Sequence, residues 1–214
     1  MSREIDIERW PRKRQYDFFK DFDYPHFNIS ANIDITEAFH YTKTKKTSLF
    51  KTILYVSMKT INAIPEFRTR IRDNRIIEHD VIHPSFTVDV EDNQFSFCNA
   101  DYDEDVTRFF QNAENAIRRV RENPFIQSDV TQDNRVYISC IPWISFTGVM
   151  HPIHMHPVDS VPRLAWGKYI INDNTVKLPY SIQAHHALAD GYHAGLFFKQ
   201  FQEIIDYPEA IFAK

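Results

Sequence analysis

The stretch Gln183-Ala184-His185-His186-Ala187-Leu188-Ala189-Asp190-Gly191 joins a pair of histidines to an aspartate and a glycine. A strand-like run precedes it and a helical pattern follows it, so the histidines fall at a boundary between two elements. Histidine has the side-chain pKa nearest neutrality, and it can therefore accept a proton at pH 7 and return it. Taken alone, the pattern is more often a surface histidine pair ahead of a capped helix. The rest of the chain favours a general base.

Hydrophobic periodicity on the N-terminal side of this stretch predicts helices interspersed with strands. Helices are expected over residues 47–63 and 105–122, with Asp105 as a cap for the second, and a last helix is expected to begin at Asp190-Gly191. The apolar residues that this last helix is expected to bury are Leu196, Phe197, Phe201 and Ile204. The expected strands are Arg75–His79, Ser85–Val90, Val136–Ile141, Lys168–Asn172 and Val176–Gln183.

The polar break Asp173-Asn174-Thr175 separates the last two expected strands and predicts a hairpin. Helices interspersed with strands, of which one pair is antiparallel, indicate an α/β fold. We expect a single domain over residues 1–214, built as a two-layer sandwich of helices on a mixed β-sheet.

The composition excludes several classes of protein. A net charge of −4 and a pI near 6.2 argue against nucleic acid or an anionic membrane as the main partner. The chain has only 4 glycines, from which neither GxGxxG nor a P-loop can be assembled. Cys98 and Cys140 are too few for a disulfide framework. Residues 1–9 are too charged for a signal peptide, and no run of about 18 apolar residues occurs, so we expect a cytoplasmic protein that does not enter a membrane.

Further motifs occur in order along the chain. They are Trp10-Pro11-Arg12-Lys13 with Phe18-Phe19, Ile33-Asp34-Ile35-Thr36, Pro65-Glu66-Phe67-Arg68, His83-Pro84-Ser85-Phe86-Thr87-Val88, Phe95-Ser96, Ile138-Ser139-Cys140-Ile141-Pro142-Trp143-Ile144-Ser145-Phe146 and Gly167-Lys168-Tyr169. Together with the HHxxxDG motif at residues 185–191, they resemble the chloramphenicol acetyltransferase family from about residue 5 to about residue 206. HHxxxDG alone also marks the acyltransferase cores of 2-oxoacid dehydrogenases, whereas the P-W-I-S-F block and the opening arginine are typical of the chloramphenicol-type branch.

The resemblance implies an enzyme that transfers an acetyl group from acetyl-CoA to a hydroxyl of chloramphenicol, and with it a role in antibiotic resistance. His186 would be the general base, and Ser139 would stabilise the oxyanion of the tetrahedral intermediate. Asp190 would pair with Arg12 and so support the loop that carries the base. Acetyl-CoA would be a co-substrate, and neither a permanently bound cofactor nor a metal ion is expected.

The resemblance also implies how the substrates bind. Residues at acceptor-facing positions are Phe18, Phe19, Phe95, Phe97 and Tyr137, and Lys168 is the candidate for a CoA phosphate. Members of the family are trimers with the active site at the subunit boundary. We therefore expect a homotrimer in which His186 of one chain faces an acceptor pocket supplied largely by its neighbour. The 18 phenylalanines, more than one core needs, agree with this.

The chain departs from the family pattern on the acceptor side. Ala165 stands where the family has a threonine that holds a water near the intermediate. Tyr137 stands for an asparagine, and Phe97 for a small residue. An acetyltransferase for a different hydroxyl acceptor and a catalytically inactive relative therefore remain alternatives.

Three histidines, His151, His154 and His156, replace the family's Asn- and Phe-rich sequence in the loop 148–159. Their spacing is compatible with zinc chelation. Pro152 and Pro157 stiffen the loop, however, and no Cys or Glu lies nearby, so a pocket wall or simple surface exposure is favoured. Because adjacent residues on a strand point to opposite faces, His185 is assigned to structural support of His186.

Overall fold

The computed structural model describes residues 1–124 and 132–213, and within them two β-sheets organise the chain. The strands are β1 (Ser2–Ile5), β2 (His26–Asp34), β3 (Thr69–Arg72), β4 (Arg75–His79), β5 (His83–Asp89), β6 (Phe95–Asn99), β7 (Arg135–Ile141), β8 (Arg163–Gly167), β9 (Ile170–Asn172) and β10 (Thr175–His185). The helices are α1 (Lys13–Phe19), α2 (Thr36–Lys45), α3 (Leu49–Ala63), α4 (Val106–Glu122), α5 (Gly191–Ile205) and α6 (Pro208–Phe212), with short 3-10 helices η1 (Ile7–Arg9), η2 (Pro65–Arg68) and η3 (Glu91–Asn93).

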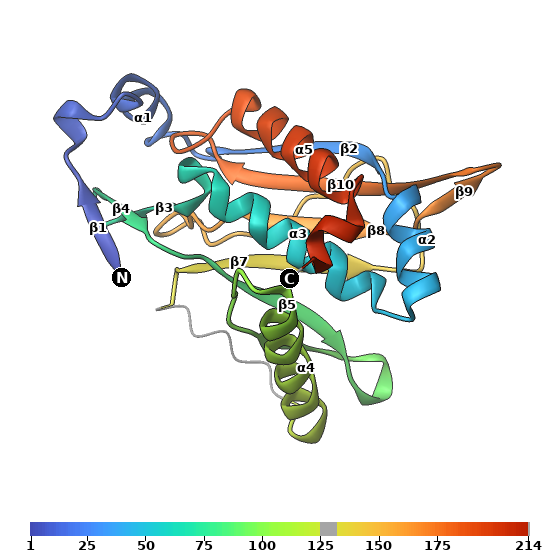
Figure 1. Cartoon of the computed structure of the whole chain (residues 1–214). Helices are drawn as coiled ribbons and strands as arrows, with labels where there is room; N and C mark the ends of the chain where they lie inside the picture. Colours follow the sequence, from blue (N-terminus) through green and yellow to red (C-terminus); the bar gives the residue numbers. More distant parts are fainter. Residues whose placement is uncertain (125–131, 214) are drawn as a thin grey trace.

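The larger sheet has the strand order β2-β10-β8-β7-β5-β6, with β9 paired to β10, and the smaller has the order β1-β4-β3. The larger sheet is mixed. β7 runs parallel to both β5 and β8, and all the other strand pairs of this sheet are antiparallel. In Figure 1, α5, α3 and α4 lie in succession along it, from β10 toward β5. The predicted fold class, helices on a mixed sheet, is confirmed.

The two faces of the larger sheet differ in chemistry. Apolar residues at alternate positions, such as Ile33, Ile138 and Leu164, point into one core shared with α3, α4 and α5. The intervening residues on the other face are largely polar. Examples are Asn28, Ser30, Tyr137, Ser139, Ser181 and Gln183. The predicted site residues on β7 therefore belong to the face that the helices do not cover.

The three predicted helices are confirmed, and each begins where a polar cap was available. Ser48, Asp105 and Asp190 accept a hydrogen bond from the first turns of α3, α4 and α5. The predicted burial along α5 is only partly right. Phe197 and Phe201 are fully buried, but Leu196 and Ile204 are half-buried, because the stripe that faces the sheet continues through Ile205 instead.

The predicted strand Lys168–Asn172 is wrong at its start. β8 ends at Gly167 and β9 begins only at Ile170. A Cβ atom on Gly167 would lie 2.7 Å from the carbonyl oxygen of Ile144, and the Lys168 N–H donates to that same oxygen at 2.7 Å. The segment after β7 thus packs against the backbone at Gly167 and interrupts the ladder. The predicted hairpin between β9 and β10 is confirmed, with Asp173 in the left-handed region.

The small sheet and α1 lie at one end of the molecule, and the β9–β10 hairpin lies at the other (Figure 1). The C-terminal end of β10 points toward α1, which brings residues near the N-terminus next to the HHxxxDG motif. In the described ranges, no helix has both the length and the apolar composition needed to cross a lipid bilayer.

Candidate active site

The His186 side chain is held by the backbone and by two neighbouring rings. The backbone N–H of His186 donates to the carbonyl oxygen of Pro25 at 2.7 Å, which extends the β2–β10 ladder one residue past the pair His185 and His26. The imidazole stacks on Phe19, with centroids 3.9 Å apart and planes 6° apart, and Phe27 lies 5.0 Å away. The ring is half-buried, so these contacts fix its orientation while leaving part of it accessible.

Only one nitrogen of the His186 ring is open to a substrate. Nδ1 is buried and has no hydrogen-bond partner among the residues that the structure describes. A proton exchanged with a bound substrate must therefore pass through Nε2, the nitrogen at the outer end of the ring.

His185 is held in a different way. It is buried, and its Nδ1 accepts a hydrogen bond from the Ala187 N–H at 3.2 Å, which leaves the proton of a neutral ring on Nε2. Burial, and next the proximity of His26, lower the pKa of His185 to about 3. His26 in turn donates from Nε2 to the carbonyl oxygen of Asp159 at 2.6 Å. These contacts support a structural role for His185.

Arg12 and Asp190 form an ion pair although 178 positions separate them in the sequence. Arg12 Nη1 donates to Asp190 Oδ2 at 2.8 Å, and Arg12 is only 8% exposed. Burial alone would raise the pKa of Asp190, but the hydrogen bond from Arg12 and the positive charge of His193 outweigh it and lower that pKa to about 2. Asp190 Oδ1 also accepts from the Tyr192 N–H at 3.0 Å, so one carboxylate joins Arg12 to the start of α5.

We expect Asp190→Asn to lower the free energy of unfolding by about 2 kcal/mol at pH 7, because it leaves the Arg12 charge buried and unpaired. The pKa of Asp190 is lower in the folded chain than the usual value near 3.9, so its contribution is present above that value. The contribution is lost as the pH falls toward about 2. Urea unfolding of both proteins between pH 7 and pH 2 measures this, and the two curves should converge in acid.

Asp17 provides the control for that measurement, because its ion pair with Lys13 is exposed. Asp17→Asn should cost less than about 0.5 kcal/mol at any of these pH values. A difference in the free energy of unfolding between wild type and Asp190→Asn that stayed constant down to pH 2 would contradict the stabilising role assigned to the negative charge of Asp190.

Ser139 lies on the polar face of β7, far from His186 of the same chain. It pairs with Ala165 on β8, and Ala165 pairs with Ser181 on β10. His185 is therefore two strands away from Ser139 and four residues further along β10 than Ser181. This separation corresponds to roughly 16 Å between the Cα atoms of Ser139 and His185, and His186 lies one residue beyond. A base and an oxyanion donor that act on one tetrahedral centre must lie within roughly 6 Å of each other. One chain does not bring them together.

The predicted acceptor-binding residues divide into two groups in the same way. Phe18 and Phe19, which pack together with centroids 4.9 Å apart, lie beside His186. Phe97 on β6 pairs with Thr87 on β5, and the parallel register of β5 with β7 puts Thr87 beside Ser139. Phe95 packs on Phe97, with ring centroids 5.6 Å apart. Both rings therefore lie on the Ser139 side.

Two more predicted site residues lie on the Ser139 side of the sheet. Tyr137 is two residues from Ser139 on the same strand and points to the same face. Lys168, the candidate for a CoA phosphate, is exposed just after the end of β8.

A cavity of about 680 Å³ opens on the polar face between α1, the β3–β4 hairpin and the histidine-containing loop. Its wall carries many ionisable side chains. They include Lys20, Arg72, Asp133, Tyr137, His154, His156, Asp159 and His185. The loop is anchored through Gln183, whose side-chain oxygen accepts from the His151 N–H at 2.8 Å. Two of the three loop histidines thus contribute to a pocket wall.

His151 itself is half-buried, and burial lowers its pKa to about 4. Across residues 1–124 and 132–213, no three His, Cys, Asp or Glu side chains are arranged to hold a metal ion.

Sequence reasoning gave neither His193 nor Glu66 a part in holding Asp190. His193 lies 2.8 Å from Asp190 Oδ1, and Glu66 lies 3.4 Å from His193. Glu66 stands within a quoted motif, but nothing in its spacing relates it to α5. Phe27, which packs on His186, was missed because the strand around it was not predicted.

Comparison with known proteins gives consistent results over nearly the whole chain. The family model described as chloramphenicol acetyltransferase matches residues 2–202. A chloramphenicol acetyltransferase of Clostridium perfringens is 34% identical over 203 residues, covering 94% of this chain and 93% of that protein. One of Clostridium butyricum is 30% identical with the same coverage.

Solved structures extend the likeness to the fold. A structure of a chloramphenicol acetyltransferase superposes with a TM-score of 0.84 at 27% identity, covering 96% of this chain and 100% of that chain. The dihydrolipoamide acetyltransferase of Azotobacter vinelandii shares the fold, with a TM-score of 0.68 at 20% identity over 88% of this chain and 84% of that one.

Proposed function

The chain belongs to the chloramphenicol acetyltransferase family, and we propose that it acetylates a hydroxyl of chloramphenicol with His186 as the general base. It is an acetyl-CoA-dependent acetyltransferase. The observation that carries the proposed role of His186 is the geometry of its ring. Phe19 and Phe27 fix the imidazole, and a buried Nδ1 leaves only Nε2 for proton transfer.

In the proposed reaction, His186 Nε2 takes the proton of the acceptor hydroxyl while its oxygen attacks the thioester carbonyl of acetyl-CoA. The carbonyl oxygen becomes an oxyanion, which accepts a hydrogen bond from the Ser139 hydroxyl. When the intermediate collapses, the carbon–sulfur bond breaks and CoA leaves as a thiolate that takes the proton from His186. Lys168 would pair with a phosphate of CoA.

We infer that the active site forms between two copies of the chain in a homotrimer. The strand register supports this, because it keeps Ser139 and His186 of one chain apart. Exposed apolar side chains lie both around His186 and around Ser139, the two parts of the proposed site. Phe18, Phe22 and Tyr24 are exposed near His186, while Phe95, Trp143 and Ile144 are exposed on the Ser139 side. Apolar surface of this kind is typical of a subunit interface.

The activity is tested by following the free thiol of CoA after acetyl-CoA and chloramphenicol are added together. We expect turnover that requires both substrates, with a kcat of about 1–10³ s⁻¹, the range typical of enzymes. Acetyl-CoA without an acceptor is the control. No release above that background with chloramphenicol would contradict the proposed acceptor, and no release with any alcohol would support an inactive relative.

A second candidate function is acetylation of a more polar hydroxyl compound. The cavity of about 680 Å³ supports it, because its wall contains the predicted acceptor residue Tyr137 together with ionisable side chains such as Lys20 and His156, and such side chains can bind the polar substituents of an acceptor. A panel of polar and apolar alcohols in the same thiol assay separates the two. A polar alcohol with a kcat/KM above that of chloramphenicol would identify the preferred class of acceptor.

A further inference from the structure

We propose that His193 and Glu66 are positioning residues for the acetyl transfer, which hold Asp190 in place and through it the loop that carries His186. This inference rests on the proposed roles of His186 and Asp190 and adds two residues to them. It concerns a chain of contacts that runs from η2 through α5 to the segment before α1.

The four side chains form a continuous series in which positive and negative charges alternate. Arg12 Nη1 lies 2.8 Å from Asp190 Oδ2, and Asp190 Oδ1 lies 2.8 Å from His193 Nδ1. The other nitrogen of that ring, Nε2, lies 3.4 Å from Glu66 Oε1. Arg12 and His193 are each only 8% exposed, so little water competes for these contacts.

The geometry favours a positively charged His193. Both of its nitrogens face carboxylates, which only accept hydrogen bonds when ionised, and an imidazolium can donate to both. The Asp190 N–H also points at Nδ1, at 3.3 Å, and the shorter contact of this nitrogen with the carboxylate favours the protonated form.

The surrounding charges agree with this state. Burial lowers the pKa of His193, but the contact with Glu66 and the charges of Glu66 and Asp190 outweigh it, so the pKa is raised in spite of the repulsion from Arg12. The same contact with His193 lowers the pKa of Glu66 against the effect of burial. The series therefore contains two cations and two anions.

The consequence for His186 follows from the short connection between the two residues. Only Ala187, Leu188 and Ala189 separate His186 from Asp190, and all of them are buried. A displacement of the Asp190 carboxylate is therefore expected to displace the His186 ring as well. Because displacement of a reacting group by about 1 Å can cost 10²-fold in rate, the partners of Asp190 matter to turnover.

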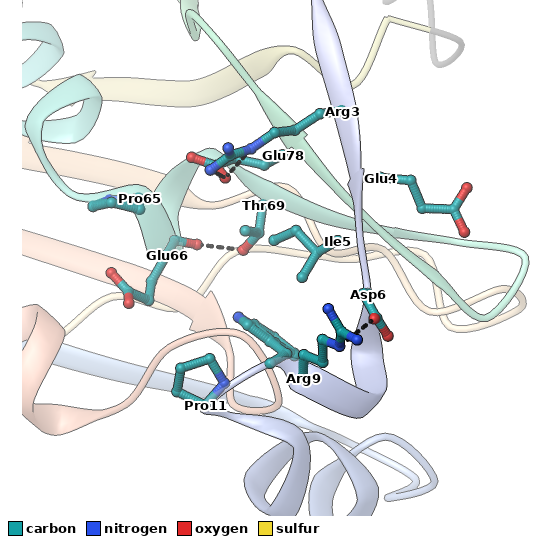
Figure 2. Close-up of a pocket in the computed structure, with 11 residues that line it drawn as sticks. Arg3, Glu4, Ile5, Asp6, Arg9, Pro11, Pro65, Glu66, Thr69 and Glu78 are labelled. Atoms are coloured by element: carbon teal, nitrogen blue, oxygen red, sulfur yellow. Dashed lines mark hydrogen bonds and ion pairs between the residues drawn. The ribbon is translucent and has the colours of Figure 1, made fainter.

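Glu66 can be tested separately from the rest of the series. It lines a cavity of about 390 Å³ together with Glu78, and Figure 2 shows its carboxylate apart from the Arg3–Glu78 pair. Glu78 is bound by Arg3 at 2.7 Å and by Arg68 at 2.9 Å, and neither arginine contacts Asp190. Glu78→Gln therefore removes a carboxylate from the same cavity without touching the series, and it is the matched control.

The experiment compares Glu66→Gln, Glu66→Asp and Glu78→Gln with wild type in kcat and KM between pH 6 and pH 10. We expect Glu66→Gln to lower kcat about tenfold at pH 8 with KM for both substrates within about twofold. We expect kcat to fall at alkaline pH when His193 loses its proton. In Glu66→Gln this fall should occur about one pH unit lower than in wild type, because the neutral amide no longer stabilises the His193 imidazolium. Glu66→Asp should restore most of the wild-type dependence of kcat on pH. Glu78→Gln should leave the alkaline fall in kcat at the same pH as in wild type.

Titration of the His193 ring by NMR in the full-length protein gives a second readout, with the imidazolium persisting to higher pH in wild type than in Glu66→Gln. An unshifted kcat profile for Glu66→Gln, or the same shift in Glu78→Gln, would overturn the inference. If His186→Ala and Asp190→Asn both leave turnover intact, the proposed catalytic roles fail instead. The two failures can thus be told apart.

Discussion

We expect His186→Ala to lower kcat by about 10²–10⁴-fold, the range that a general base contributes, and to leave the melting temperature close to that of wild type. The loss is expected because Nε2 of this ring is the nitrogen free to accept the acceptor's proton. Stability is expected to change little, since the half-buried ring has no hydrogen bond from Nδ1 to any residue that the structure describes, and its main contacts are with Phe19 and Phe27. The thiol-release assay and a thermal melt measure the two quantities on the same preparation.

His40→Ala is the control, because this exposed histidine lies on α2, lines neither of the two cavities and lies outside the proposed proton path. It should retain kcat within about twofold. If His186→Ala retained more than a tenth of wild-type turnover at saturating substrates, His186 would not be the base. If it unfolded at a much lower temperature, the ring would have a structural role in place of the catalytic one.

The sequence predicted elements well where a polar cap met a clear apolar stripe. The predicted starts at residues 47, 105 and 190 lie within two residues of the observed starts of α3, α4 and α5, where Ser48, Asp105 and Asp190 are the caps. It failed for β2 and β8, for opposite reasons. β2 alternates correctly, but Asn28, Ser30 and Asn32 are poor strand formers, and β8 is buried on both faces and shows no alternation.

The candidate site was predictable only in part for a similar reason. Motifs identify which residue types are present, and the resemblance to a family supplied the pairing of Arg12 with Asp190. The contact of Glu66 with His193 depends on how η2 packs beside α5, which no local pattern encodes. The separation of Ser139 from His186 depends on strand register across β7, β8 and β10, and a single sequence does not specify it.

That register leads to the second large effect. We expect Ser139→Ala to lower kcat by about 10²–10³-fold, as loss of an oxyanion donor does. In the inferred trimer the base and the donor of one site come from different chains. Ser139→Ala and His186→Ala trimers, each nearly inactive alone, should therefore regain activity when they are unfolded and refolded together. A site is intact when its histidine comes from one variant and its serine from the other. Random mixing gives this combination at about one quarter of the sites in a cyclic trimer.

The measurement is the kcat per site of the refolded mixture against each variant refolded alone, with two different affinity tags to prove that mixed trimers form. Recovery to about a quarter of wild-type activity is expected, and recovery should disappear when Ser139→Ala is mixed with a chain that carries both substitutions. In that mixture every intact histidine lies in a chain without its serine, and no partner can supply one. Mixed trimers that form but stay inactive would contradict a shared site, and the roughly 16 Å gap within each chain would then have to close by rearrangement of the sheet.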